Sequence, residues 1–156
     1  MSDLYTAEWT AAYITTPKTN FPTGDVGGVM RCLYGEYDLS AAIVSADQVY
    51  FFKIPKGARV IGGYLFSDDL GNTITAEVGW NASADGSTEA ADTDGFMNAV
   101  DLNAAAICVD LIGQTATGRP GIGKKFAAEV DCVLTAEATG TATSGTVRLC
   151  LYYVLD

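Results

Sequence analysis

The side chains that most often perform catalysis are sparse in this sequence. No histidine occurs among its 156 residues, whereas aspartate and glutamate together number 19. Without imidazole, Ser-His-Asp and Cys-His nucleophilic arrangements and the usual imidazole-containing metal sites cannot form. A paired-carboxylate mechanism of the glycosidase type remains open, because the sequence does not give the separation between carboxylates. We expect no enzymatic activity and keep the carboxylate pair as the alternative.

The densest group of carboxylates falls in residues 85–95, where Asp85, Glu89, Asp92 and Asp94 alternate with glycine and small polar residues. Calcium prefers oxygen ligands from loops of this kind. However, the D-x-[DN]-x-[DN]-G spacing is missing, and an ordinary solvated turn has the same composition. We therefore interpret the segment as a solvated acidic loop, with calcium binding as the alternative, and expect no cofactor.

Four cysteines occur without a C-x-x-C spacing, which disfavours a zinc site. They are Cys32, Cys108, Cys132 and Cys150. We expect free thiols that pack as small apolar groups. A disulfide between neighbouring strands, such as one joining Cys132 and Cys150, is the alternative. The glycine-rich segments 113–118 and 121–125 lack the spacing of a phosphate-binding loop and are interpreted as connections between strands.

The charge balance bears on the class of partner. Nine lysines and arginines against 19 acidic residues give a formal net charge of −10. The longest basic cluster is the pair Lys124–Lys125, so we expect no nucleic acid partner. There is no apolar window of 18 residues and no charged leader followed by an apolar stretch. We therefore expect that the protein does not associate with membranes. We also expect that it is synthesised in the cytoplasm.

Alternation with a period of two dominates after residue 28 and predicts strands. The predicted strands cover residues 30–39, 49–54, 58–66, 74–80, 95–102, 106–112, 125–134 and 146–155. Pro55-Lys56-Gly57 predicts a turn, and Gly62-Gly63 predicts a bulge or a close backbone approach. About eight short strands without a long amphipathic helix indicate an all-β, antiparallel, jelly-roll-like β-sandwich. The alternation does not give the order of the strands.

Two strands carry more specific expectations. The last strand, 146–155, is apolar on both faces, which predicts that both of its faces are covered. Trp80 alternates with other apolar residues, so we expect it in the core. The alternative is that Trp80 faces outward with Tyr64 and Phe66 as an aromatic platform for sugars.

Residues 1–28 differ from the rest of the chain. Tyr5, Trp9 and Tyr13 are spaced four apart and are followed by Phe21. This spacing predicts either a short helix over residues 2–13 or an extended N-terminal arm, with a β-sandwich domain over residues 29–156. The four aromatic residues need a surface to cover. We predict that they form a partner interface, with packing on the protein's own body as the alternative.

Three segments resemble small structural proteins of tailed bacteriophages, of the type that decorates or cements capsids. They are VYFFKIPKGARVIGGYL at residues 49–65, LGNTITAEVGW at residues 70–80 and GTVRLCLYY at residues 145–153. The likeness covers about two thirds of the chain, and its motifs describe a sandwich scaffold rather than a site.

The resemblance implies a non-enzymatic virion protein on the capsid surface. It implies a homotrimer that binds the major capsid protein and stabilises the shell by bridging capsomers. Two other functions remain open on the same fold. One is a carbohydrate- or receptor-binding module of a phage appendage, and the other is a different virion component, such as a neck, tail or shell subunit.

Overall fold

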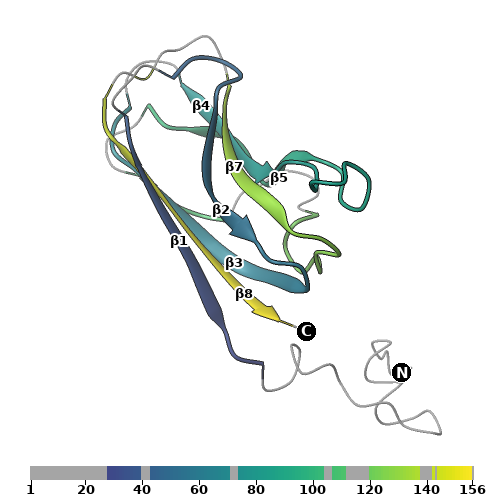
Figure 1. The fold of residues 1–156 in the computed structure, drawn as a ribbon. Coiled ribbons are helices and arrows are strands. Elements are labelled where there is room, and N and C mark those ends of the chain that lie inside the picture. The colour runs from purple at the N-terminus through teal and green to yellow at the C-terminus, as the bar shows by residue number, and fades with distance from the viewer. Residues whose placement is uncertain are drawn as a thin grey trace, which may run out of the picture.

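Two four-stranded antiparallel sheets pack face to face in the computed structural model of the chain (Figure 1). The structure describes residues 28–39, 43–70, 74–103, 107–111, 120–137, 142 and 144–155. In spatial order, the first sheet contains β1 (Arg31–Asp38), β8 (Thr146–Leu155), β3 (Ala58–Ser67) and β6 (Ile107–Asp110). The second contains β2 (Gln48–Ile54), β7 (Val130–Glu137), β4 (Thr75–Trp80) and β5 (Asp92–Asp101).

The order of the strands identifies the topology. Every connection except that from β4 to β5 carries the chain from one sheet to the other. The resulting orders, β1-β8-β3-β6 and β2-β7-β4-β5, are those of a jelly roll built from two Greek keys. The prediction of an all-β jelly-roll sandwich is confirmed.

The core lies between the sheets and is densest around three aromatic rings. The Trp80 ring lies edge-on to Phe96 and Phe126, with centroid separations of 5.2 and 5.1 Å. Trp80 is 2% exposed, so its predicted place in the core is confirmed and the outward platform that includes it is wrong. Aliphatic side chains such as Leu65 and Leu151 complete the layer.

The local signals around β3 are confirmed. Residues 55–57 form a turn in which Gly57 has a φ of 83°. The register of β3 against β8 shifts between Val60 and Gly62, which is the predicted bulge. At Gly63 a Cβ would lie 2.3 Å from the carbonyl oxygen of Cys150, so the backbones of β3 and β8 approach closely there.

Two predictions about strands need correction. The strand predicted over 125–134 begins only at Val130 and continues to Glu137. The N–H of Phe126 donates to the carbonyl of Ala58, at the start of β3, so residues 125 and 126 bond to the first sheet instead of extending β7. The strand predicted to be covered on both faces is β8. Among the described residues, Val154 is buried on its outward side, whereas the other four outward residues are only half-buried.

Some predictions fall outside the described part of the chain. They include the N-terminal helix or arm, its residues Tyr5, Trp9, Tyr13 and Phe21, and the glycine-rich segment 113–118. The described residues contain no helix with the length and apolar character needed to cross a lipid bilayer.

Candidate interaction surface

The outward side of the first sheet carries rows of aromatic, thiol and charged side chains. In one row, Tyr34, Cys150, Tyr64 and Asp110 are register partners across β1, β8, β3 and β6. In the next row the partners are Glu36, Arg148, Phe66 and Cys108. Cys32 and Tyr152 pair beyond the first row. We call these ten residues the aromatic face.

The rings on the aromatic face are accessible. Tyr34 is 57% exposed, and Tyr64 and Phe66 are each 37% exposed. The Tyr64 ring lies 6.2 Å from Phe66 and 6.3 Å from Tyr152, centroid to centroid, so the rings form a contiguous patch across β3 and β8. The described residues place no other segment over these rings.

The main charges on this face neutralise one another. Arg148 Nε donates to Glu36 Oε2 at 2.8 Å, and Tyr34 Oη donates to the same oxygen at 2.9 Å. The hydrogen bond to Glu36 raises the pKa of Tyr34 and also that of Arg148. The patch therefore presents aromatic rings beside an ion pair. If a partner covered the patch, Arg148 and Glu36 would each still have an opposite charge beside them.

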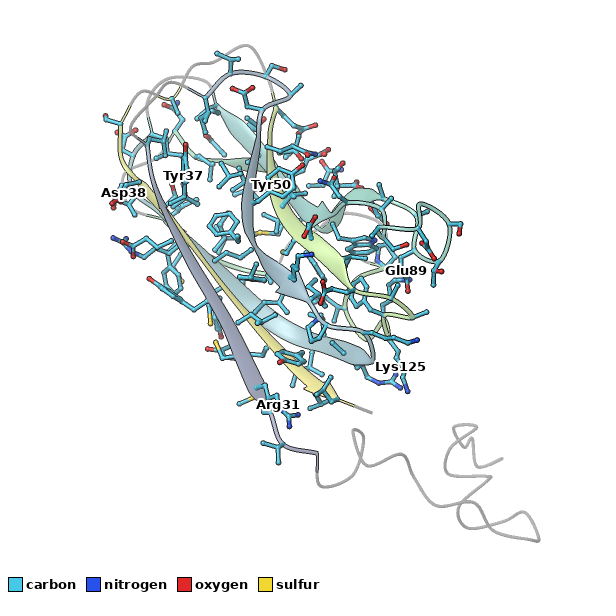
Figure 2. The ribbon with its side chains drawn as sticks, in the orientation of Figure 1. Arg31, Tyr37, Asp38, Tyr50, Glu89 and Lys125 are labelled. Atoms are coloured by element: carbon cyan, nitrogen blue, oxygen red, sulfur yellow. The ribbon has the colours of Figure 1, made fainter. Side chains whose placement is uncertain are left out.

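The outward side of the second sheet, which we call the polar face, differs in character. Tyr50, which is labelled in Figure 2, is 61% exposed there. Its hydroxyl nevertheless accepts from Asn81 and donates to Gln48. Nearby, Lys53 Nζ lies 3.0 Å from Glu129 Oε1. Such a bonded polar network suits contact with water.

The polar face also holds an unexpected pair of carboxylates. Glu77 on β4 and Glu137 on β7 interact with each other, and Thr93 Oγ1 donates to Glu77 at 3.0 Å. Burial, followed by the bond to Glu137, raises the pKa of Glu77. The alternation over 74–80 places Glu77 on the outward face, but Glu137 lies beyond the strand predicted over 125–134, and the pair could be recognised only once β4 and β7 were known to be neighbours.

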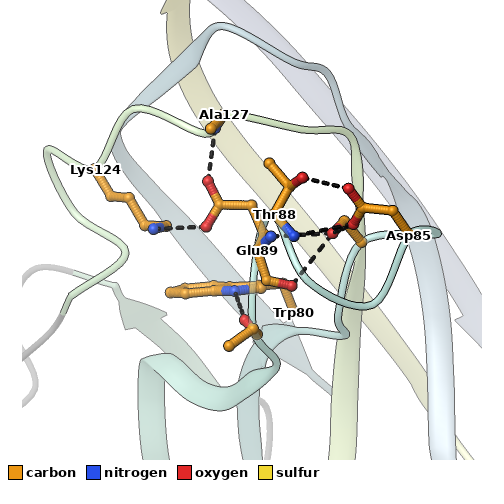
Figure 3. Close-up of polar contacts among 8 residues, drawn as sticks. Trp80, Asp85, Thr88, Glu89, Lys124 and Ala127 are labelled. Atoms are coloured by element: carbon orange, nitrogen blue, oxygen red, sulfur yellow. Dashed lines mark hydrogen bonds and ion pairs between the residues drawn. The ribbon is translucent and has the colours of Figure 1, made fainter.

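The acidic segment is a folded loop whose first carboxylate is bonded within the loop (Figure 3). Asp85 accepts from the hydroxyls of Ser83 and Thr88 and from the backbone N–H groups of Ser87 and Thr88, at 3.1 and 3.0 Å. These bonds, with the Ser83 hydroxyl first, hold the pKa of Asp85 far below its usual range.

Glu89 attaches the same loop to the core (Figure 3). Its side chain lies 2.8 Å from Lys124 Nζ and accepts from the N–H of Ala127 at 2.6 Å. Burial alone would raise the pKa of Glu89, but these two contacts hold it below its ordinary value. Lys124 also lies over the Trp80 and Phe126 rings, 5.8 and 5.4 Å from their centroids.

These partners give the acidic segment contacts within the protein. Two of its carboxylates bond to the protein, and burial and a bond to Asp94 raise the pKa of Asp92. Within the described ranges, no group of three or more histidine, cysteine, aspartate or glutamate side chains is placed to hold a metal ion. The loop therefore has a structural role in closing one end of the sandwich.

The cysteines are all free, but two of them are close together. Cys132 faces the core from β7, whereas Cys150 lies on the aromatic face of the other sheet, so the pairing named as an alternative is wrong. Instead, Cys150 Sγ lies 3.1 Å from Cys32 Sγ.

Sequence reasoning missed the aromatic face. Tyr64 and Phe66 were considered only as companions of Trp80, which lies on the other sheet and points inward. The available signal was the apolar character of both faces of β8. That signal predicts cover on both faces, whereas within the described residues most of the outer side of β8 is partly accessible.

Comparisons with known proteins give structural likenesses only. No protein-family model matches the chain, and no curated protein matches it in sequence. A chain of the capsid of Ralstonia phage GP4 superposes with a TM-score of 0.66 and 22% identity, covering 94% of each chain. A chain of the cyanophage Pam1 capsid asymmetric unit superposes with a TM-score of 0.59 and 22% identity, covering 92% of this chain and 99% of that one. The three chains share a fold.

Proposed function

We propose that this chain is a non-enzymatic structural protein of a bacteriophage virion. It binds the capsid surface, contacts the major capsid protein and stabilises the shell by bridging neighbouring capsomers. The fold shared over nearly the whole chain with two chains of phage capsid structures supports the proposal. So does the sequence resemblance of three segments to capsid decoration proteins.

The observation that carries the proposal is the contrast between the two outward faces. The aromatic face presents Tyr34, Tyr64 and Phe66 around a neutralised ion pair, whereas the polar face is bonded to itself. Protein interfaces are enriched in tyrosine, phenylalanine and arginine and depleted of unpaired charge at their centre. The partner that fits the aromatic face is therefore a protein subunit of the shell.

Stabilisation of a shell follows from mass action. A protein that binds only the assembled lattice adds its binding free energy to the cost of breaking that lattice. An oligomer gains further, because its second and third contacts occur at high effective concentration. The proposal therefore includes a homotrimer, in which residues 1–28 grip the shell through Tyr5, Trp9, Tyr13 and Phe21 and the sandwich acts as a rigid body.

The first test removes the aromatic rings from one face at a time. The double variant Tyr64→Thr/Phe66→Thr removes two rings from β3 and replaces them with threonine, which is β-branched and favours strands. Tyr50→Thr is the matched control on the polar face. In co-sedimentation with shells of the parent phage that lack this protein, we expect the double variant to weaken binding by at least about tenfold. The control should change binding by less than about twofold. Equal binding by all three proteins would refute the role of the aromatic face.

The second test addresses the N-terminal segment. A chain lacking residues 1–28 should sediment with the same shells much more weakly, because the four aromatic residues are lost. Circular dichroism of the truncated chain must retain the β signal of the intact chain. A truncated chain that binds shells with unchanged affinity would overturn the gripping role.

A carbohydrate- or receptor-binding role is the second candidate. The exposure of Tyr34 and Tyr64 on a flat sheet favours it, since tyrosine rings can stack on sugars. Binding on a glycan array that is lost in Tyr64→Thr, together with no binding to shells, would favour this role over capsid stabilisation.

A further inference from the structure

The aromatic face carries two cysteines whose sulfur atoms nearly touch. Cys32 Sγ lies 3.1 Å from Cys150 Sγ, and the two residues lie 118 positions apart in the sequence. In the register of β1 against β8, Cys32 pairs with Tyr152 and Cys150 pairs with Tyr34. The cysteines are therefore diagonal neighbours on the same side of two adjacent strands.

We propose that Cys32 and Cys150 form a reversible disulfide that clamps β1 to β8 when the protein meets an oxidising environment. The thiol pair is a redox-sensitive modification site. It is a property of the isolated chain and does not depend on the proposed function.

The position of β1 makes bond formation feasible. A disulfide requires the sulfur atoms to approach to about 2.05 Å, which is about 1 Å closer than they lie here. Within the described ranges β1 pairs with β8 alone, so it is an edge strand there and can shift without breaking a second ladder between described strands. The adjustment therefore falls on one strand and leaves the core between the sheets in place.

The other two cysteines lie too far away to compete. Cys108 is on β6, and β3 separates that strand from β8, so two inter-strand spacings of about 4.8 Å intervene. Cys132 is fully buried on the core side of β7, where burial strongly raises the pKa of its thiol. A buried, protonated thiol does not react readily with an external disulfide.

The reaction balances with a small-molecule disulfide such as oxidised glutathione as the oxidant. The exposed Cys32 thiolate attacks one glutathione sulfur and breaks the glutathione disulfide, and the released glutathione thiolate takes up the proton lost by Cys32. The Cys150 thiolate then attacks Cys32 Sγ and displaces the second glutathione thiolate, which takes up the proton lost by Cys150. The protein loses two electrons, and oxidised glutathione is reduced to two thiols.

The experiment incubates the purified full-length chain with excess oxidised glutathione at pH about 8.5, where more of the thiol is ionised. Afterwards, denatured samples are alkylated and digested for mass spectrometry. We expect one cross-linked peptide pair that contains Cys32 and Cys150, whereas an exposed thiol outside the pair, such as Cys108, is alkylated or carries glutathione. The melting temperature should rise by about 5–15 °C and return to its starting value with dithiothreitol.

Two variants make the result specific. Cys108→Ser removes an exposed thiol from the same face and should leave the cross-link and the melting shift unchanged. Cys32→Ser should abolish both, with each remaining cysteine either alkylated or carrying glutathione and none cross-linked to another. Four alkylated cysteines in the oxidised wild-type chain, an intramolecular bond to Cys108, or only intermolecular bonds on a non-reducing gel would each overturn the proposal.

Discussion

At the scale of single residues, Lys124 combines two roles that are usually separate. Its ammonium neutralises the buried carboxylate of Glu89, while it also lies over the rings of Trp80 and Phe126. Glu89 is only 6% exposed, so its charge has little access to water. The ion pair therefore holds the acidic loop against the end of the core.

Replacing Lys124 with methionine should destabilise the fold. The substitution leaves the buried Glu89 carboxylate with the N–H of Ala127 but without a counter-charge. We expect a loss of about 2–3 kcal/mol in the free energy of unfolding, less than for a fully buried pair because Lys124 keeps some contact with water. Urea denaturation at pH 7 measures the loss, and Lys56→Met at an exposed turn position is the control. Equal stability of the two variants would contradict the role of Lys124.

Glu77 predicts a dependence of stability on pH. Its pKa in the folded chain is raised by burial and by Glu137, and Asp94 adds repulsion. The native state therefore binds more protons than the unfolded chain, so this pair lowers stability as pH rises above about 4.5, the ordinary pKa of a glutamate.

Glu77→Gln should remove this effect, because glutamine can still bond to Thr93 and Glu137 without a charge. At pH 7.5 we expect the melting temperature to rise by about 1–4 °C, with the gain shrinking towards pH 4.5. Scanning calorimetry across this range measures it. Glu129→Gln, which removes an exposed carboxylate paired with Lys53, should give no gain. A gain for Glu77→Gln that is constant with pH would rule out the carboxylate repulsion.

At the scale of elements, glycine permits the close packing of β5 against β4. A Cβ on Gly95 would lie 2.2 Å from a ring carbon of Trp80, and a Cβ on Gly121 would lie 2.3 Å from the Phe96 ring. Both glycines therefore make room for the aromatic cluster at the loop end of the sandwich. The cluster has no spare volume on that side.

Gly95→Ala should consequently cost about 2–3 kcal/mol of unfolding free energy, because the Trp80 ring or the β5 backbone must shift. Gly86→Ala is the informative control. Gly86 has a φ of 67° and open space around its Cβ position, so only the backbone preference, about 1 kcal/mol, is lost. Equilibrium unfolding of both variants compares the two costs. A smaller loss for Gly95→Ala than for Gly86→Ala would show that the cluster can relax.

The alternation of apolar and polar residues predicted the strands well where the alternating residues also form the backbone hydrogen bonds of one sheet. Gln48–Ile54 and Ala58–Ser67 agree with the alternation to within one residue, and the turn and bulge agree with their glycines. The alternation failed at 125–129, where the apolar spacing continues but the backbone bonds to the other sheet. Neighbours across strands, including the Glu77–Glu137 and Cys32–Cys150 pairs, depend on strand order, which alternation does not contain.

At the scale of the whole molecule, the net charge and the aromatic face have opposite effects on association with other proteins. Each chain carries a formal charge of −10, which repels other copies, while the aromatic face favours association with protein. The aromatic face itself carries a formal charge of −1, from Glu36, Asp110 and Arg148, so most of the net charge lies elsewhere on the chain. Charge repulsion over longer distances should therefore limit self-association.

Added salt should strengthen self-association of the chain. Screening shortens the range of the repulsion between copies from about 14 Å at 50 mM salt to about 4 Å at 500 mM. We expect the dissociation constant to fall several-fold over this range, as measured by sedimentation equilibrium. Tyr64→Thr/Phe66→Thr should abolish association at both concentrations. Weaker association at high salt would indicate contacts made by charged groups instead of the aromatic face.

The place of β8 has a consequence for how the chain is made. β8 is the last strand in chain order, yet it lies between β1 and β3 and is the partner that joins them. Until β8 has left the ribosome, β1 lacks its described partner strand. The apolar inner sides of β1 and β3 are then not yet joined in one sheet. The sandwich therefore cannot be completed before β8 emerges, and until then the apolar inner sides of β1 and β3 are exposed to aggregation.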